Sequence, residues 1–159
     1  MNKYLLAALA IIIIASVAAL LILAQNTALH NSGNISGFTF ANTSYKFTYV
    51  ATTPQEWQKG LMNYSVTNTT FELFVFPKVS IYPFWMYDTY YPLDIIWING
   101  SRVTYVAHAI PCSWYSPGQT DCMVYNNYTS AHYANYVIEA RGGFANSTGL
   151  RTGSIVSIS

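Results

Sequence analysis

The chain has 159 residues, of which 52% are hydrophobic and 16% aromatic, enough to build the core of one compact domain. Only 8% of the residues are charged, against about 25% in an average soluble domain, and the net charge is +1. This balance excludes the basic surface that nucleic-acid binding requires, and it leaves Asn, Ser, Thr and Tyr to solvate the domain.

The first element in chain order is an uncharged apolar run from Leu5 to Ala24. As a helix, a run of this length spans about 30 Å, the thickness of the hydrocarbon core of a bilayer. Ile22-Leu23-Ala24 is a poor signal-peptidase site, so we expect an uncleaved anchor over residues 1–25, with a cleaved signal peptide as the alternative. Lys3 precedes the run and the next cation is Lys46, which predicts a single-pass cell-membrane protein whose C-terminal part is extracellular.

An extracellular location also agrees with the residues that follow. Residues 26–37 are polar and predict a linker, after which the domain occupies residues 38–159. Cys112 and Cys122 suit an oxidising exterior and predict a disulfide across Pro117-Gly118, with a metal-binding thiol pair as the alternative. Sequons of the form Asn-x-Ser/Thr predict a glycosylated surface, with acceptors at Asn34, Asn42, Asn63, Asn68, Asn99, Asn127 and Asn146.

The sequence of the first half of the domain predicts several strands and one short helix. Residues 38–40 begin the fold, and residues 45–51 predict the first long strand. Thr53-Pro54-Gln55-Glu56 combines an N-cap, a proline at the first helical position and a capping-box glutamate, so a short helix should run to about Gly60. Its Trp57 and the following Leu61 should face the core. Residues 70–76 predict a strand that ends at Pro77.

The second half centres on a predicted hairpin. Pro83 precedes a strand over residues 84–86, and residues 93–98 are apolar on both faces, as in a strand buried on both sides. Asn99-Gly100 predicts a two-residue turn, with the return strand reaching Ile110. A loop over 111–127, a strand over 133–140, a short helix over 143–149 and a strand over 154–158 should follow. The predicted fold class is mainly β (α+β), a compact antiparallel domain with one or two short helices.

Asp94 is the exception in the apolar hairpin. A two-residue turn would place it opposite Tyr105 and would place His108 on the other face, so a dyad of Asp94 and His108 would need a bulge. We expect a structural carboxylate that accepts hydrogen bonds from the backbone or from Tyr105, with a ligand-binding or catalytic role as the alternative. The same register places Trp97 opposite Arg102 and predicts a cation–π contact.

Several ordered segments resemble one bacterial and archaeal family. They include Phe84-Trp85-Met86 followed by Pro92-Leu93-Asp94-Ile95-Ile96, then Leu73-Phe74-Val75-Phe76-Pro77 and Tyr136-Val137-Ile138-Glu139. These segments resemble domain of unknown function 192, also called uncharacterised protein family 0127, over residues 45–158. The chain departs from the family at Tyr87 and Asp88, where Lys-Asn is usual. The resemblance implies a fold and no activity.

Candidate ligand-binding residues in these segments are Trp85, Met86, Asp94 and Glu139, and no catalytic residue is assigned. The histidines at 30, 108 and 132 show no metal-ligand spacing, and the methionines are more typical of a core than of a copper(I) site. We therefore expect no cofactor.

Three functions remain open at this point. The first is a non-enzymatic binding or cell-envelope module with glycans or envelope proteins as partners. The second is a self-assembling subunit of a cell-surface filament. The third is an enzyme that uses Asp94.

Overall fold

The computed structural model describes residues 14, 16–17, 35–111, 123–124 and 132–159. The chain divides into two units, residues 1–34 and residues 35–159. In the first unit Ile14, Ser16 and Val17 are helical. Within the described ranges, none of the helices has both the length and the apolar character needed to cross a bilayer. The predicted anchor otherwise lies outside the described residues, as do most of the linker, both cysteines and the sequons at Asn34 and Asn127.

The described part of the second unit is built on a five-stranded sheet in the order β3-β4-β9-β6-β7. Its strand pairs are antiparallel, except that β3 and β4 run parallel. The strands are β3 (Tyr49–Ala51), β4 (Phe71–Ser80), β6 (Leu93–Asn99), β7 (Arg102–Ala109) and β9 (Ala134–Arg141).

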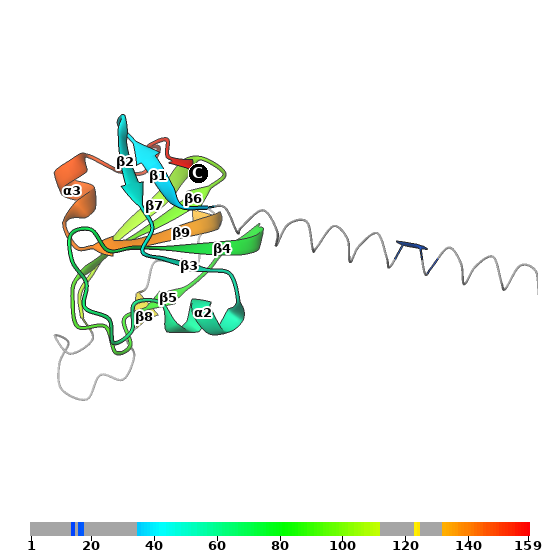
Figure 1. Cartoon of the computed structure of the whole chain (residues 1–159), viewed down its shortest axis with the longest axis horizontal. Coiled ribbons are helices and arrows are strands. Elements are labelled where there is room, and N and C mark those ends of the chain that lie inside the picture. The colour runs from blue at the N-terminus through cyan, green and yellow to red at the C-terminus, as the bar shows by residue number, and fades with distance from the viewer. Residues whose placement is uncertain (1–13, 15, 18–34, 112–122, 125–131) are drawn as a thin grey trace, which may run out of the picture. The chain divides into compact units, whose positions relative to one another are not determined.

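Smaller elements cover both faces of this sheet (Figure 1). One face, called here the α3 face, is covered by β1 (Gly37–Phe40), β2 (Thr43–Lys46), α3 (Phe144–Thr148) and β10 (Ser157–Ile158). The other, the α2 face, is covered by α2 (Pro54–Lys59) and by the pair of β5 (Phe84–Trp85) and β8 (Met123–Val124). The predicted class, a mainly β domain with two short helices, is confirmed for the described residues.

Strand β6 forms the centre of the core because both of its faces are apolar. Leu93, Ile95 and Trp97 pack in the cluster on the α2 face, whereas Ile96 and Ile98 pack in the cluster on the α3 face. This division follows the two-residue period of a strand and confirms the prediction that residues 93–98 are buried on both sides.

Helix α2 starts as the sequence predicts. The Thr53 side chain accepts the Glu56 N–H, and the Glu56 carboxylate accepts the Thr53 N–H at 2.9 Å, which completes the capping box. Leu61 is buried, and Trp57 is partly buried against the core. The helix therefore packs on the sheet at a fixed position.

Several predicted strand boundaries are wrong, including that of the last strand, which covers Ser157–Ile158 and not residues 154–158. The strand predicted over 45–51 is two strands, because β2 ends at Lys46 and β3 begins at Tyr49 in the other sheet. Strand β4 continues past Pro77 to Ser80. The pairing of β4 with β9 is irregular between Val75 and Ser80, so a proline without an N–H breaks no regular hydrogen bond there. Strand β8 lies inside the segment predicted as a loop.

The predicted hairpin register is also wrong. Asn99 pairs with Arg102, so the turn residues are Gly100 and Ser101, and a shift between Trp97 and Ile98 leaves Thr104 as an extra residue. Further along, Trp97 therefore faces Tyr105, and the expected contact of Trp97 with Arg102 is lost. The Arg102 guanidinium instead donates to the Gly153 carbonyl at 3.1 Å.

Candidate functional site

A groove of about 450 Å³ lies between α2 and the segment that leads into β5. Pro54, Trp57 and Gln58 form the α2 wall, and Phe76 together with residues 82–85 forms the opposite wall. None of these lining residues is charged, and Gln58 supplies the amide among them. The groove is thus an uncharged and largely aromatic surface.

Hydrogen bonds and ring stacking hold the walls of the groove in place. The Trp57 indole N–H donates to the Ala51 carbonyl at 3.1 Å, and its ring lies 5.0 Å from that of Phe76. Tyr82 stacks on Phe76 with centroids 3.6 Å apart, and its hydroxyl donates to the Lys78 carbonyl at 2.8 Å. Partial burial raises the pKa of Tyr82 above its usual value.

Trp85 is the exposed aromatic residue of the groove, with 42% of its surface accessible. Its ring lies 5.9 Å from the Tyr87 ring, which is also exposed. Phe84, the preceding residue, is buried and packs edge-on against Phe74 and Trp97. Alternation along β5 therefore anchors one side chain in the core and leaves the next in solvent.

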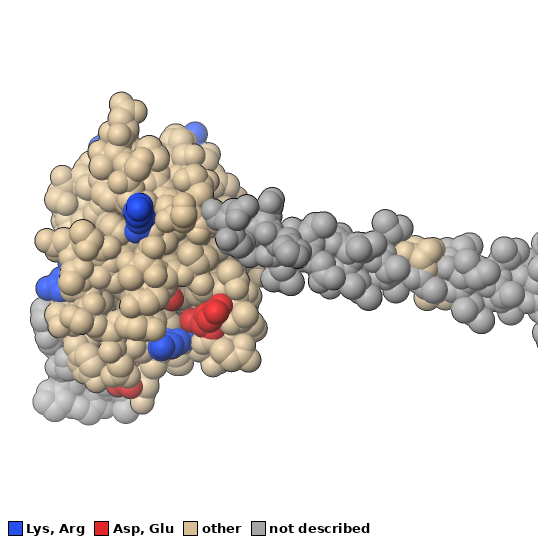
Figure 2. Space-filling model, viewed as in Figure 1, with Lys and Arg blue, Asp and Glu red and all other residues tan. Residues whose placement is uncertain are grey.

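Charged residues are sparse on the domain face drawn in Figure 2, where a few basic and acidic side chains stand in a largely uncharged surface. One reason is that Glu72, Asp94 and Glu139 are buried. Three of the six acidic residues of the chain are thereby removed from the surface.

Two of these buried acids, Glu72 and Glu139, lie directly opposite one another on β4 and β9. The Glu139 carboxylate accepts the Leu61 N–H at 3.3 Å, just after α2. Burial raises the pKa of each carboxyl to about 8, and the Glu72 charge adds to the rise at Glu139. This pair lies under the end of the helix that also forms one wall of the groove.

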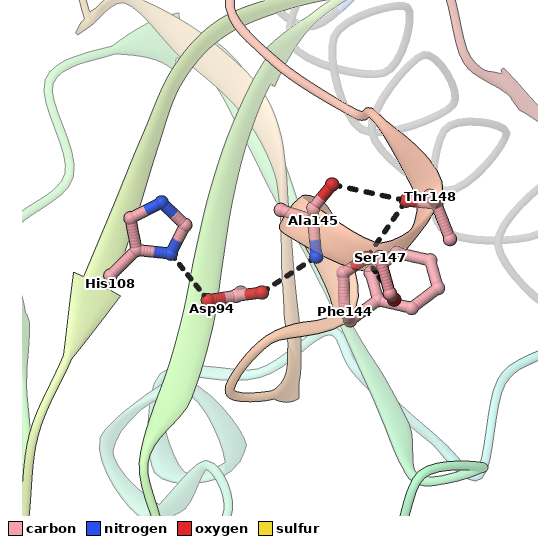
Figure 3. A network of polar contacts seen from close by, with 6 residues as sticks. All are labelled: Asp94, His108, Phe144, Ala145, Ser147 and Thr148. Atoms are coloured by element: carbon pink, nitrogen blue, oxygen red, sulfur yellow. Dashed lines mark hydrogen bonds and ion pairs between the residues drawn. The ribbon is translucent and has the colours of Figure 1, made fainter.

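Asp94 lies on the other face of the sheet and is fully buried. One of its oxygens contacts His108 Nδ1 at 2.7 Å, and the other accepts the Ala145 N–H of α3 at 2.7 Å (Figure 3). The displaced turn and the bulge at Thr104 together move the register by three residues and bring His108 opposite Asp94, in place of the predicted Tyr105. As expected, the carboxylate accepts a hydrogen bond from the backbone.

The His108 side chain is 55% exposed and is oriented by Asp94. A carboxylate on one ring nitrogen holds the imidazole in place and leaves the other nitrogen for a proton or a ligand. A dyad of this kind supplies a proton acceptor but no nucleophile. Within the described residues, no group of three His, Cys, Asp or Glu side chains could hold a metal ion.

The four predicted ligand-binding residues do not form one site. Trp85 lines the groove, Met86 is buried in the core of the α2 face, and Glu139 lies under α2. Asp94 lies on the α3 face, where it accepts the Ala145 N–H. Of the four residues, Trp85 lines the groove, and the other three are buried inside the domain.

Sequence reasoning missed several residues that the structure places at these sites. Phe76 and Tyr82 line the groove, where the fold brings Phe76 and Trp57 beside residues 82–85. Glu72 carried a usable signal, since it interrupts the apolar run of β4 as Asp94 interrupts that of β6. Glu72 and Asp94 thus carry the same sequence signal, a carboxylate within an apolar strand.

The sequons within the described residues are all exposed. Glycosylation requires an accessible side-chain amide, and this condition holds at each of these positions; modification itself stays a prediction. The exposed acceptors are Asn42, Asn63, Asn68, Asn99 and Asn146.

A family model for DUF192, described as an uncharacterised ACR, matches residues 41–158. The chain belongs to the DUF192 family. The resemblance predicted from its motifs over residues 45–158 is therefore confirmed. A search among curated proteins found no match for this DUF192 chain.

Two solved structures resemble the DUF192 domain. A protein of unknown function from Novosphingobium aromaticivorans is 27% identical, with a TM-score of 0.58 over 77% of this chain and 82% of that one. A protein from Sinorhizobium meliloti, named as a candidate transcription regulator, is 22% identical, with a TM-score of 0.60 over 77% and 90% of the two chains. At that identity the second likeness shows the fold alone.

Proposed function

We propose that this DUF192 chain is a non-enzymatic binding domain, anchored in the cell membrane and exposed outside the cell, whose aromatic groove holds a neutral glycan. The observation that carries the proposal is the groove beside Trp85, which combines exposed and half-buried aromatic rings with uncharged walls. Aromatic side chains supply a large apolar contact area, and their ring faces attract the polarised C–H groups of a sugar.

The lining chemistry favours a neutral sugar over a charged ligand. None of the lining residues offers a cation to a phosphate or carboxylate, or an anion to an amine. Gln58 can both donate to and accept from sugar hydroxyls at the rim. The predicted glycan coat of the exterior provides a source of such ligands.

The membrane anchor and the extracellular location are inferred from the sequence. The apolar run from Leu5 to Ala24 has the length of a membrane span, and the position of Lys3 favours an internal N-terminus. The exposed sequons support an extracellular domain. The two donors on Asp94 support a structural carboxylate, which favours binding over catalysis.

A titration with a panel of neutral oligosaccharides built from glucose, galactose, mannose and N-acetylglucosamine tests the proposal. We expect saturable binding to the purified domain, and we expect Trp85→Ala to weaken it by about tenfold or more, since one stacked ring contributes roughly 1–2 kcal/mol. Calorimetry would measure the affinity.

Tyr133→Ala is the matched control, because Tyr133 is equally exposed at 42% but does not line the groove. The control should bind as the wild type does. Absence of binding across the panel, equal losses in both variants, or binding of a proline-rich peptide in place of the sugars would contradict the proposal.

A further inference from the structure

The buried acids Glu72 and Glu139 form a pair whose hydrogen bonding is incomplete. They are direct neighbours across β4 and β9, and their exposed fractions are 5% and 4%. Side chains directly opposite in an antiparallel pair have Cβ atoms about 5 Å apart. Two charged carboxylates at this spacing in an apolar layer repel strongly, so the arrangement is stable only when protons are retained.

The hydrogen-bond donors around the pair do not satisfy two carboxylates. Glu139 Oε2 accepts the Leu61 N–H, whereas Glu72 Oε2 is buried and has no hydrogen-bond partner among the described residues. A buried charged oxygen without a donor is costly, and a protonated carboxyl removes that cost. The geometry thus favours a neutral Glu72.

The charged and titratable groups around the pair explain its proton affinity. On α2, the Lys59 ammonium lowers the pKa of Glu72 and the Glu56 charge raises it, but burial outweighs both and brings it to about 8. The Lys59 ammonium is itself bonded to the Tyr64 hydroxyl at 2.8 Å. Tyr49 lies beside Glu72 on β3, and Arg141, farther along β9, donates to the Val66 carbonyl at 2.6 Å.

The pair is connected to the groove through the end of α2. A Cβ placed on Gly60 would lie 3.2 Å from Glu139 Oε2 and 3.2 Å from the Phe74 ring, so the chain passes directly over the carboxyl. Phe74 packs in turn on Phe84, which lines the groove, at a centroid distance of 4.9 Å. Separation of the two carboxyls would therefore displace the helix that carries Trp57.

We propose that Glu72 and Glu139 retain protons under the end of α2 and thereby position the groove wall, so that alkaline surroundings open this layer and weaken ligand binding. The pair is a positioning device for the groove, and its effect on binding rests on the proposed function. The proton-dependent packing of α2 does not depend on the proposed glycan binding.

The expected direction of the pH dependence follows from linkage. An unfolded glutamate loses its proton near its ordinary pKa of 4.5, whereas the folded groups keep theirs to about 8. Between these values the unfolded chain binds fewer protons than the folded one, so stability falls as the pH rises through this window. The stabilisation is complete below about pH 4.5 and lost above about pH 8.

The test compares the full domain with Glu72→Gln and Glu139→Gln between pH 5 and pH 9.5, first without ligand. Glutamine keeps the shape of the side chain and cannot ionise, and in Glu139→Gln it still offers an acceptor to Leu61. We expect the thermal midpoint of the wild type to fall with pH and that of each variant to fall less. At pH 9, exchange of the Leu61 amide and the Trp57 indole proton should be about tenfold faster in the wild type than in Glu72→Gln.

Parallel midpoint profiles in all three proteins would overturn the inference, and so would equal exchange at Leu61 and Trp57. The oligosaccharide panel, titrated at pH 6 and pH 9, separates the two proposals. If the ligand-free differences appear but no sugar binds at either pH, the glycan function fails and the proton pair stands. If a sugar binds equally at both pH values, the coupling to the groove fails and the glycan function stands.

Discussion

The two faces of the central sheet bury carboxylates in opposite ways. On the α3 face, Asp94 has a partner for each oxygen, one from His108 and one from the backbone of Ala145. On the α2 face, Glu139 accepts one backbone donor, the Leu61 N–H, and Glu72 Oε2 has no partner among the described residues. A buried acid with complete partners fixes a fold, whereas a pair with too few donors keeps protons and responds to pH.

The two groups of buried carboxylates also differ in where they lie relative to the groove. The Asp94 network joins β6, β7 and α3, and it lies away from the groove. The glutamate pair lies beneath α2, whose exposed side forms a groove wall. The α3 face is therefore expected to tolerate little change, and the α2 face to couple its packing to ligand binding.

The largest effect should come from breaking the satisfied carboxylate. Asp94→Ala leaves the buried Ala145 N–H without an acceptor and opens a cavity, so we expect a loss of about 3 kcal/mol in the free energy of unfolding. Urea denaturation at pH 7 measures it. Asp94→Asn is the control, because its amide oxygen can still accept the Ala145 N–H, and it should lose less. An unchanged or raised stability in Asp94→Ala would instead indicate a functional carboxylate.

A smaller effect should come from the chain segment over the glutamate pair. Gly60 has φ +47° and ψ −141°, a conformation available essentially to glycine, and an added Cβ would press on Glu139 and Phe74. We expect Gly60→Ala to destabilise the domain by about 2 kcal/mol. Gly100→Ala is the control, since Gly100 has φ +62° but no atom within 4 Å of an added Cβ.

The loss in the Gly100 control should be about 1 kcal/mol, the strain of a left-handed residue alone. The difference between the two variants combines the contact with the α2 layer and the greater backbone strain at Gly60. Equal losses in urea denaturation would mean that the end of α2 is not held tightly over the pair, and the contrast between the two faces would weaken.

The sequence predicted those features that depend on local chemistry. The capping box at Thr53 and Glu56 and the apolar alternation of residues 93–98 need only neighbouring residues, and both predictions are confirmed. The dyad of Asp94 and His108 depended on a turn displaced by one position and on one bulge. The bulge matters most for the face, because a one-residue shift of register turns each side chain to the other face of the sheet. Turn signals alone do not fix such a bulge, because the segment around Ser154 also bonds to this hairpin.

The groove illustrates the same limit. Trp85 was identified as a ligand-binding candidate and Tyr82 lies in the same segment, but Phe76 and Trp57 reach the groove from β4 and α2. Their common position depends on how α2 packs against β4, which is a tertiary property. The groove could not be assembled from sequence neighbours.

The most direct test of the account is the NMR response of the tryptophan indole protons to the neutral oligosaccharide panel. Trp57 and Trp85 line the groove, whereas Trp97 is buried and bonds through its indole N–H to the Tyr82 carbonyl at 2.9 Å. The account predicts that a bound sugar shifts the Trp57 and Trp85 signals and leaves that of Trp97 nearly unchanged. A panel that shifts neither groove signal, or that shifts only residues outside the groove, would contradict it.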